Sequence, residues 1–321
     1  MPAASPQKSA AVIGAGITGV TTAYALLERG YAVTVYDRLR YPAMETSFAN
    51  GGQLSASKAE VWNSWANVRK GMGWLLKADA PLKLNLAPSF HKYSWLLEFL
   101  TNIGGYERNT VETTKLAIRA RESLRRMAER EQIQFDQLDR GILHIYANEA
   151  GFAHAKRVNA LYAKAGLARR EVSPADVAAI EPTVKGDLVG AFFTESDSTG
   201  DIHKFTRGLA DACVRQGATF QCETEVAVQP VAEGGVLVAH DGGETRHDVG
   251  VVCAGVGSRK IARALGDRLN IYPVKGYSIT VELHDAASQA AAPQVSLLDA
   301  DAQVVTSRLG DRFRVAGTAE F

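Results

Sequence analysis

The sequence predicts an α/β fold in which a Rossmann-like nucleotide-binding domain is interrupted by an inserted α+β domain, and three observations favour it. A short apolar run at residues 11–13 is followed at once by the glycine pattern G-x-G-x-x-G. A helical stretch then leads to a second β-branched run that ends in an acid, Asp37. Far along the chain, residues 249–258 show another buried-strand pattern that is followed directly by glycines. This pattern is typical of a nucleotide-binding domain that is formed by two separate segments of the chain.

Each glycine of the G-x-G-x-x-G pattern has its own physical role. Gly14 permits the tight turn, Gly16 lets a pyrophosphate approach the backbone, and Gly19 allows close packing of helix on strand. The phosphates are expected at the N-terminus of the following helix, where the backbone N–H groups have no partner within the helix.

Two other interpretations of this stretch are possible. Residues 10–27 carry no charge and are about long enough to span a bilayer, and residues 23–25 imitate a signal-peptidase site. Neither a membrane span nor a secretion signal explains the strand pattern at residues 32–36 and the acid that closes it. The nucleotide cradle is therefore favoured, with Gly30 ending the helix in a left-handed cap and Asp37 placed to bind ribose hydroxyls.

Composition limits the possible partners. The chain has 321 residues, of which 46% are hydrophobic, so it is long enough for two domains with large cores. The net charge of +1 provides no basic field for nucleic acid. Three cysteines without C-x-x-C spacing indicate reduced thiols of a cytoplasmic protein, and no metal site is expected.

The order of the elements places the domain boundaries. The nucleotide-binding domain is expected at 9–58 and 196–268, and the substrate domain at 59–195 and 269–321. Within the first part of the substrate domain, residues 59–105 are expected to be mostly helical and contain all four tryptophans. The further elements expected there are helices at 112–132 and 152–166, strands at 141–147 and 188–196, and a short helix that begins at Ser173-Pro174 and stops before Pro182. The elements expected beyond it are a helix at 204–217 capped by Asp201, strands at 219–231, 235–240 and 249–258, and a strand at 312–321.

Six segments, in the same order, resemble the FAD-dependent amine oxidoreductases and, within them, the small-subunit family of bacterial D-amino-acid dehydrogenases. These segments read "GAGITGV", "ETSFANGGQLS", "TGDIHKFT", "VVCAGVGS", "IYPVKGYSIT" and "RFRVAGTAEF". The resemblance runs from about residue 9 to residue 321, and it implies FAD rather than NAD as the cofactor.

The resemblance also implies the cofactor-binding positions. They are Val12, Ile13, Gly14, Ala15, Gly16, Ile17, Thr18, Gly19, Asp37, Arg38, Asn50, Gly51, Gly52, Gln53, Leu54, Val226, Ala254 and Gly255. By this match the glycine turn binds the pyrophosphate, Asp37 binds the adenosine ribose, and residues 50–54 run beside the pyrophosphate toward the flavin ring. The backbone of Val226 meets the adenine, and Ala254 with Gly255 forms the turn under the cofactor.

Catalytic side chains are not expected to stand out, because the flavin itself takes the hydride from the amino acid. Tyr277 is a weak candidate for lining the active site, together with Lys275. His203 is better explained as a surface or capping residue and Cys253 as core.

The family pattern continues beyond Phe321 with a segment that contains an arginine for the substrate carboxylate and with a glycine-rich segment at the flavin. We therefore expect the chain to be a C-terminally truncated fragment that does not turn over amino acids.

The activity implied by the resemblance is oxidative deamination of D-amino acids to 2-oxo acids and ammonia, with electrons passed to a quinone chain rather than to oxygen. Two alternatives within the class stay open: a glycine- or sarcosine-type amine oxidase, and a cyanide-forming glycine dehydrogenase subunit. A third alternative is a non-catalytic nucleotide-binding fragment. The expected location is cytoplasmic. Peripheral contact with the inner face of the cell membrane through the basic and tryptophan-rich residues 61–100 is one interpretation, and packing of these tryptophans within the substrate domain is the favoured alternative.

Overall fold

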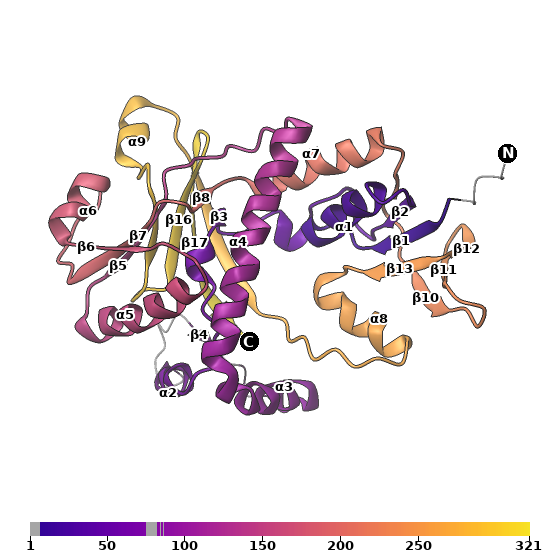
Figure 1. Cartoon of the computed structure of the whole chain (residues 1–321), viewed down its shortest axis with the longest axis horizontal. Helices are drawn as coiled ribbons and strands as arrows, with labels where there is room; N and C mark the ends of the chain where they lie inside the picture. The colour runs from indigo at the N-terminus through magenta and orange to yellow at the C-terminus, as the bar shows by residue number, and fades with distance from the viewer. Residues whose placement is uncertain (1–6, 75–81, 84, 86) are drawn as a thin grey trace. The chain divides into compact units, whose positions relative to one another are not determined.

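A computed structural model of the protein describes residues 7–74, 82–83, 85 and 87–321, and it divides into two compact units. As far as these ranges are described, the first unit consists of Met1–Ala49, Met127–Phe135 and Ile202–Tyr272, and the second of Asn50–Arg126, Asp136–Asp201 and Pro273–Phe321. Each unit has its own sheet and its own core (Figure 1).

A four-stranded parallel sheet in the order β13-β1-β2-β9 is the centre of the first unit. Its strands are β1 (Ser9–Ile13), β2 (Ala32–Tyr36), β9 (Thr219–Gln221) and β13 (Val249–Val252). The helices of this unit are α1 (Ile17–Leu27), α7 (Ile202–Arg215) and α8 (Ser258–Ala264), and the end of α4 (Tyr106–Glu131) also belongs to it. The 3-10 helices are η1 (Glu45–Ser47) and η4 (Gly255–Gly257). Gly30 adopts φ +80° and the Tyr31 N–H donates to the Leu26 carbonyl, so α1 ends at the predicted glycine.

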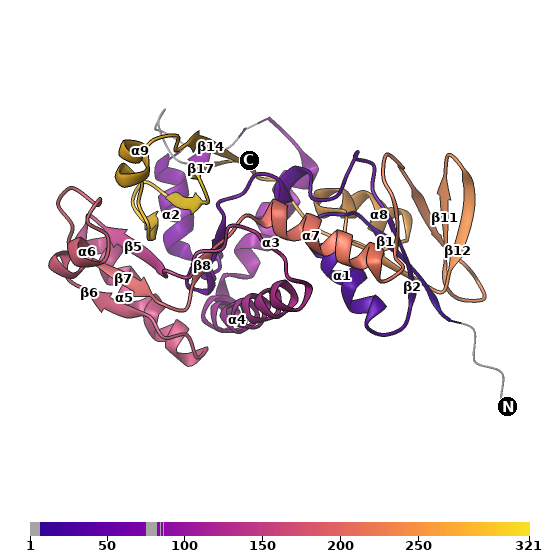
Figure 2. The ribbon, with the colours of Figure 1, turned by 90° about the horizontal axis from the view of Figure 1, so that it is seen from above.

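An antiparallel meander covers one face of this sheet (Figures 1 and 2). Its strands are β10 (Ala227–Pro230), β11 (Val236–His240) and β12 (Gly243–His247). Val228 and Val238 of the meander are buried in one cluster with Ala11, Ile13 and Tyr36 of the sheet. The β-branched pattern of each strand is thus explained by burial against the other layer.

A mixed sheet is the centre of the second unit, with the path β14-β17-β16-β15-β5-β7-β6 and with β4 paired to β17. Its strands are β4 (Leu82–Lys83), β5 (Ile142–Tyr146), β6 (Arg170–Val172), β7 (Gly190–Thr194), β14 (Lys275–Glu282), β15 (Ser296–Asp299), β16 (Val304–Leu309) and β17 (Arg312–Glu320). The helices are α2 (Trp65–Trp74), α3 (Phe90–Thr101), most of α4, α5 (Glu149–Lys164), α6 (Pro174–Ile180) and α9 (Ala286–Ala291). The short elements are β3 (Gln53–Leu54), β8 (Ser198–Thr199), η2 (Ala56–Lys58) and η3 (Ile103–Gly105).

Most expected elements are present, and three differ from the prediction. The expected strand at 249–258 ends at Val252, and η4 and α8 follow it. The expected strand at 219–231 is wrong as one strand, because Glu223 adopts φ +54° and separates β9 of the parallel sheet from β10 of the meander. Helix α4 begins at Tyr106, before the expected residue 112, directly after a 3-10 turn that ends at Gly105. The start of α6 is as predicted, with Ser173 and Asp176 forming a capping box and proline in the first turn.

The compact units differ from the expected boundaries by a few residues at 196–201 and 269–272 and by longer segments at 50–58 and 127–135. Residues 50–58 belong to the second unit because β3 pairs with β8 and η2 is hydrogen-bonded to Asp197. Residues 127–135 belong to the first unit, where Ile133 packs against Gly208 and Phe135 against Phe205. Within the described ranges, no helix is both long enough and apolar enough to cross a membrane.

Candidate functional site: a glycine cradle and a cavity on the second sheet

Two glycines near the turn between β1 and α1 are required by close packing within the protein. Gly14 adopts φ +108°, and a Cβ atom there would lie 2.5 Å from the Cys253 carbonyl oxygen. A Cβ atom on Gly19 would lie 1.7 Å from the Gly14 carbonyl oxygen. Both distances are far below a van der Waals contact, so these positions exclude every larger residue. Because Gly14 is glycine, the turn can pack directly on the residue that follows β13. Because Gly19 is glycine, α1 can pack directly on the turn.

Gly16 is different, because the protein leaves room for a side chain there. Its backbone is extended, with φ −70° and ψ 179°, and the nearest atom to an added Cβ is the Ser47 Oγ at 3.4 Å. The glycine at this position is therefore not explained by packing within the chain. A ligand that approaches the backbone from outside explains it, as in the dinucleotide cradle.

Free backbone donors surround Gly16. Across the described residues, the N–H groups of Gly16, Thr18 and Gly19 make no hydrogen bond, whereas the Ile17 N–H donates to the Ser47 Oγ over 3.0 Å. These groups lie at the N-terminus of α1, where the helix dipole and unpaired donors favour an anion. An open backbone with unpaired donors fits a pyrophosphate.

Asp37 lies directly after β2 and is held by the same turn. One carboxylate oxygen accepts the Ala15 N–H over 2.6 Å, and the other accepts the Leu39 N–H over 2.8 Å. A carboxylate has about four acceptor positions, so two bonds to the backbone leave capacity for ribose hydroxyls. The neighbouring Arg38 is exposed and forms an ion pair with Glu45.

The first unit brings further expected residues to the cradle. The Cys253 N–H donates to the Ile13 carbonyl over 2.7 Å, so the turn of Ala254 and Gly255 begins where β1 ends. Val226 packs against the cluster that contains Ile13 and Tyr36.

Sequence reasoning missed a contribution from the segment between Tyr41 and Phe48. Ser47 binds the first N–H of α1, and the Ala43 N–H donates to the Ala15 carbonyl over 2.9 Å. His203, expected to be a surface or capping residue, donates from Nδ1 to the Ala43 carbonyl over 2.9 Å and packs edge-on against Phe48. The letters "ETS" at the start of the segment "ETSFANGGQLS" were the available signal, because a serine side chain can bond backbone N–H groups.

Residues 50–54 belong to the second unit, where they pack on its sheet. The Ser307 Oγ donates to the Gly51 carbonyl over 2.6 Å, and the Arg314 guanidinium donates to the Asn50 carbonyl over 3.3 Å. A Cβ atom on Gly51 would lie 2.9 Å from the Val305 Cγ2. The glycine at residue 51 is thus explained by close packing on β16, and the expected approach of this loop to a flavin stays a prediction.

The residues that follow this loop are held by a buried carboxylate. Asp197 is fully buried and accepts the N–H groups of Ala56 and Ser57 over 3.0 and 3.2 Å. Its Oδ2 also accepts the Ser55 hydroxyl over 3.2 Å, and its Oδ1 pairs with the buried Arg121 of α4. Asp197 therefore fixes η2, and with it the end of the loop.

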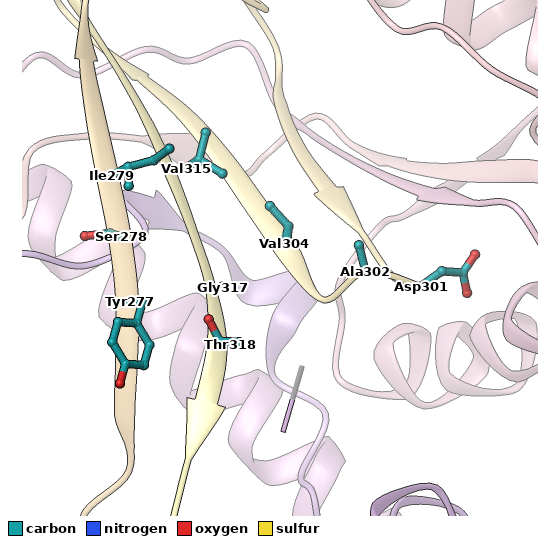
Figure 3. Close-up of a pocket in the computed structure, with 9 residues that line it drawn as sticks. All are labelled: Tyr277, Ser278, Ile279, Asp301, Ala302, Val304, Val315, Gly317 and Thr318. Atoms are coloured by element: carbon teal, nitrogen blue, oxygen red, sulfur yellow. The ribbon is translucent and has the colours of Figure 1, made fainter. Parts of the chain in front are cut away.

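A cavity of about 520 Å³ lies on the second sheet, over β14, β16 and β17 (Figure 3). Its walls are mostly apolar, with hydroxyl groups at the edge. The lining residues are Tyr277, Ser278, Ile279, Asp301, Ala302, Val304, Val315, Gly317 and Thr318. The volume is within the usual range for a small-molecule site.

Two polar side chains of the cavity, Tyr277 and Asp301, already have hydrogen-bond partners. The Tyr277 hydroxyl donates to the Glu320 carboxylate over 2.5 Å, and the Lys275 ammonium lies 4.9 Å from the centre of the Tyr277 ring. Asp301 accepts the Ala147 N–H over 2.9 Å, and Figure 3 shows its carboxylate pointing away from the tyrosine. Tyr277 thus lines this cavity; its expected place in the active site and a catalytic role stay predictions.

Comparison with known proteins agrees with the cradle. The model of the family described as DAO, FAD dependent oxidoreductase, matches residues 9–321. The chain belongs to this family. Its cofactor is therefore FAD, and the unpaired donors and the open backbone at Gly16 fit that group.

Several individual proteins are similar to this chain over most of its length. A D-amino acid dehydrogenase 3 from Mesorhizobium japonicum is 58% identical over 314 residues, which are 97% of this chain and 76% of the relative. A D-amino acid dehydrogenase from Paramagnetospirillum magneticum is 41% identical over 96% of this chain and 74% of its own length. The crystal structure of a glycine oxidase from Geobacillus kaustophilus matches with a TM-score of 0.70 over 98% of this chain and 72% of that one. At 16% identity the last similarity supports the fold alone.

A buried histidine next to η2 makes the stability of this FAD-dependent oxidoreductase sensitive to acid. His144 is 3% exposed and its Nε2 is 2.9 Å from the Ser57 Oγ. Burial lowers the pKa of His144 well below its ordinary value, and the charges of Arg169 and Lys58 lower it further. The unfolded chain binds a proton at this histidine more readily than the folded protein does. The contribution of neutral His144 to the free energy of unfolding is therefore fully present above about pH 6.5. It is lost as the pH falls below that value, by up to about 1.4 kcal/mol per pH unit.

We therefore expect the melting temperature of the wild type to fall from pH 7 to pH 5.5, a range that includes the ordinary histidine pKa of ~6.5. The melting temperature of His144→Gln is expected to fall less over the same range. The exposed His284 provides the matched control, because His284→Gln removes a histidine without removing a buried one. Equal pH dependence in the wild type and in His144→Gln would contradict the assignment.

Proposed function

We propose that the protein catalyses FAD-dependent oxidative deamination of D-amino acids to 2-oxo acids and ammonia. The observation that carries this proposal is the 58% identity to a D-amino acid dehydrogenase over 97% of the chain. Identity at that level over almost the whole chain supports a shared substrate class more strongly than the similarity in fold to a glycine oxidase at 16% identity.

The cradle residues would hold the cofactor. The N–H groups of Gly16, Thr18 and Gly19 would donate to the pyrophosphate, and the Asp37 carboxylate would accept the ribose hydroxyls. FAD, when bound, supplies the acceptor for the hydride that leaves the α-carbon of the amino acid. The imino acid that remains reacts with water to give the 2-oxo acid and ammonia.

The cavity on β14, β16 and β17 is our candidate for the amino-acid substrate. Ile279, Val304 and Val315 offer an apolar wall for a small side chain, and Tyr277 and Thr318 offer hydroxyl groups. Because the Tyr277 hydroxyl is bonded to Glu320, its contribution would be orientation of the substrate rather than proton transfer.

The acceptor and the location complete the proposal. We infer that electrons leave to a respiratory quinone rather than to oxygen, and that the protein is cytoplasmic and contacts the inner face of the membrane peripherally. The support for the acceptor is that both relatives are named dehydrogenases rather than oxidases.

Denaturing the purified protein is expected to release FAD, identified by its absorbance and mass. The reason is that the donors at Gly16, Thr18 and Gly19 and the carboxylate of Asp37 suit a dinucleotide with a ribose. Release of NAD without any flavin would overturn the cofactor assignment.

The activity test uses the flavin-loaded protein with a soluble dye as electron acceptor. Saturable reduction of the dye by D-alanine, with glycine at least tenfold slower and negligible oxygen uptake, would support the proposed function and contradict the expectation, drawn from the resemblance, that this chain does not turn over amino acids. Faster reaction with glycine and oxygen would favour an amine oxidase, and reaction with neither substrate would favour a nucleotide-binding protein without catalysis.

A further inference from the structure

The residues from Tyr41 to Phe48, called the 41–48 segment, hold a strained backbone next to the glycine cradle. Ala43 and Glu45 adopt φ +70° and +59°, a region that residues with a Cβ atom seldom occupy. Such a conformation persists only where the surrounding structure holds it, and it occurs most often at functional sites. Ala43 is also buried, with 1% of its surface exposed. The shape of the 41–48 segment therefore depends on the contacts that hold it.

Two of these contacts reach the cradle. The Ala43 N–H donates to the Ala15 carbonyl over 2.9 Å, within the glycine turn. The Ser47 Oγ accepts the Ile17 N–H over 3.0 Å, and it would lie 3.4 Å from a Cβ atom on Gly16. A displacement of the 41–48 segment would thus displace the turn and the first residue of α1, where the unpaired N–H groups suit a pyrophosphate.

The strained residue is held from its other side by His203, which lies in the first turn of α7. The His203 Nδ1 donates to the Ala43 carbonyl over 2.9 Å. Because a carbonyl oxygen can only accept, Nδ1 carries a proton whether the ring is neutral or charged. Both backbone groups of Ala43 are therefore bonded, the N–H to the cradle and the carbonyl to α7.

Aromatic rings at the two ends of the 41–48 segment surround the same histidine. The His203 ring is edge-on to Phe48, with ring centres 4.9 Å apart, and to Tyr41, with ring centres 6.2 Å apart. One turn further along α7, the Arg207 guanidinium lies 5.2 Å from the centre of the Tyr41 ring. Edge-on rings and a cation over a ring are favourable at these separations. Helix α7 thus contacts the segment at both ends and in the middle, and it also packs on α1 (Figure 2).

We propose that His203 is a positioning residue for FAD, and that it holds the cradle through the 41–48 segment in the shape that binds the pyrophosphate. His203 keeps Ala43 in its strained conformation, and Ala43 in turn holds the Ala15 carbonyl. The effect passes through the backbone rather than through contact with the cofactor. The proposal concerns cofactor binding alone, so it depends neither on the substrate nor on the electron acceptor proposed above.

The test is the dissociation constant for FAD, from flavin fluorescence, together with the melting temperature of the flavin-free protein. His203→Phe keeps a ring between Tyr41 and Phe48 but removes the donor to Ala43. We expect it to weaken FAD binding by about tenfold, the size of effect expected from the loss of one hydrogen bond. His203→Asn is the conservative variant, because its amide can donate from nearly the position of Nδ1. We expect it to recover FAD affinity to within about threefold of the wild type.

Two further variants separate positioning from general stability. His240→Phe is the matched control, because His240 is another partly buried histidine of the same unit whose hydrogen bonds stay within its own hairpin. It is expected to leave FAD affinity unchanged. Arg207→Gln removes the cation over the Tyr41 ring from an exposed position, so core packing is preserved. We expect it to weaken FAD binding by about 2- to 5-fold.

A second substitution tests the link through the strained residue. Glycine adopts φ +70° without a steric penalty, so Ala43→Gly lowers the dependence of the segment on its clamp. The loss of FAD affinity caused by His203→Phe is therefore expected to be smaller in Ala43→Gly than in the wild type. Equal losses in the two backgrounds would contradict a role that passes through Ala43.

The remaining outcomes decide between positioning and a purely structural role. A lower melting temperature of His203→Phe with unchanged FAD affinity would make His203 structural only and overturn the proposal. If His203→Phe does not fold, Arg207→Gln decides, and unchanged FAD affinity in that variant would also overturn it. A wild type that binds no FAD would refute the cofactor assignment instead. Because no substrate is present in these measurements, their failure leaves the proposed deamination untouched.

Discussion

Replacing Gly16 with alanine is expected to weaken the binding of FAD while the protein stays folded. The backbone of Gly16 is compatible with any residue, and an added methyl group would be 3.4 Å from its nearest protein neighbour, the Ser47 Oγ. The same methyl group would occupy the space by which a pyrophosphate reaches the unpaired N–H groups of the turn. Overpacking of this kind costs about 1–3 kcal/mol, which weakens binding by ~5- to 150-fold.

The measurement is the dissociation constant for FAD, from flavin fluorescence, together with the melting temperature of the protein without flavin. Gly257→Ala is the matched control, since Gly257 is also the N-cap of a helix in the same unit, and an added methyl group would be 3.7 Å from the Ala254 Cβ. Gly19→Ala is the opposite comparison, because its methyl group would be 1.7 Å from the Gly14 carbonyl oxygen and should prevent folding of the cradle. Unchanged FAD affinity in Gly16→Ala would place the pyrophosphate elsewhere.

The cradle was predictable because its determinants are local. A strand, a turn with φ above zero at Gly14, and a helix follow one another within residues 9–27, and each is encoded by the type of residue at its own position. Asp37 follows from the same pattern, because the end of β2 lies beside the end of β1 in a parallel sheet.

Contacts between distant segments were not predictable from one sequence. The bond between the Ser307 hydroxyl and Gly51 joins residues 256 positions apart, and that between Asp197 and Ala56 joins residues 141 apart. No local pattern distinguishes Asp197 from the other acids of the chain, since only its burial and its partners do. For the same reason one sequence does not show that residues 50–58 and 127–135 belong to a different compact unit from their neighbours in the chain.

A large loss of stability is expected on replacement of Asp197. Replacing it with alanine leaves the buried Arg121 without a counter-ion and removes the acceptor for the N–H groups of Ala56 and Ser57. Loss of one partner of a buried ion pair costs about 3–5 kcal/mol, a large part of the ~5–15 kcal/mol that stabilises a typical protein. We therefore expect a sharp fall in the urea midpoint.

Two comparisons show whether the loss of stability comes from the unpaired buried charge or would follow from the loss of any ion pair on α4. Glu112→Gln breaks the exposed pair of Glu112 with Lys115 on the same helix, where the two side chains are 64% and 41% exposed, and exposed pairs contribute about 0–1 kcal/mol. The double variant Asp197→Ala with Arg121→Met removes both buried charges, so we expect it to be more stable than Asp197→Ala alone. If the double variant is instead less stable by the sum of the two single effects, the charges do not interact. The η2 segment would then be held by the backbone bonds to Asp197 alone, and a variant that keeps an acceptor, Asp197→Asn, should recover most of the stability.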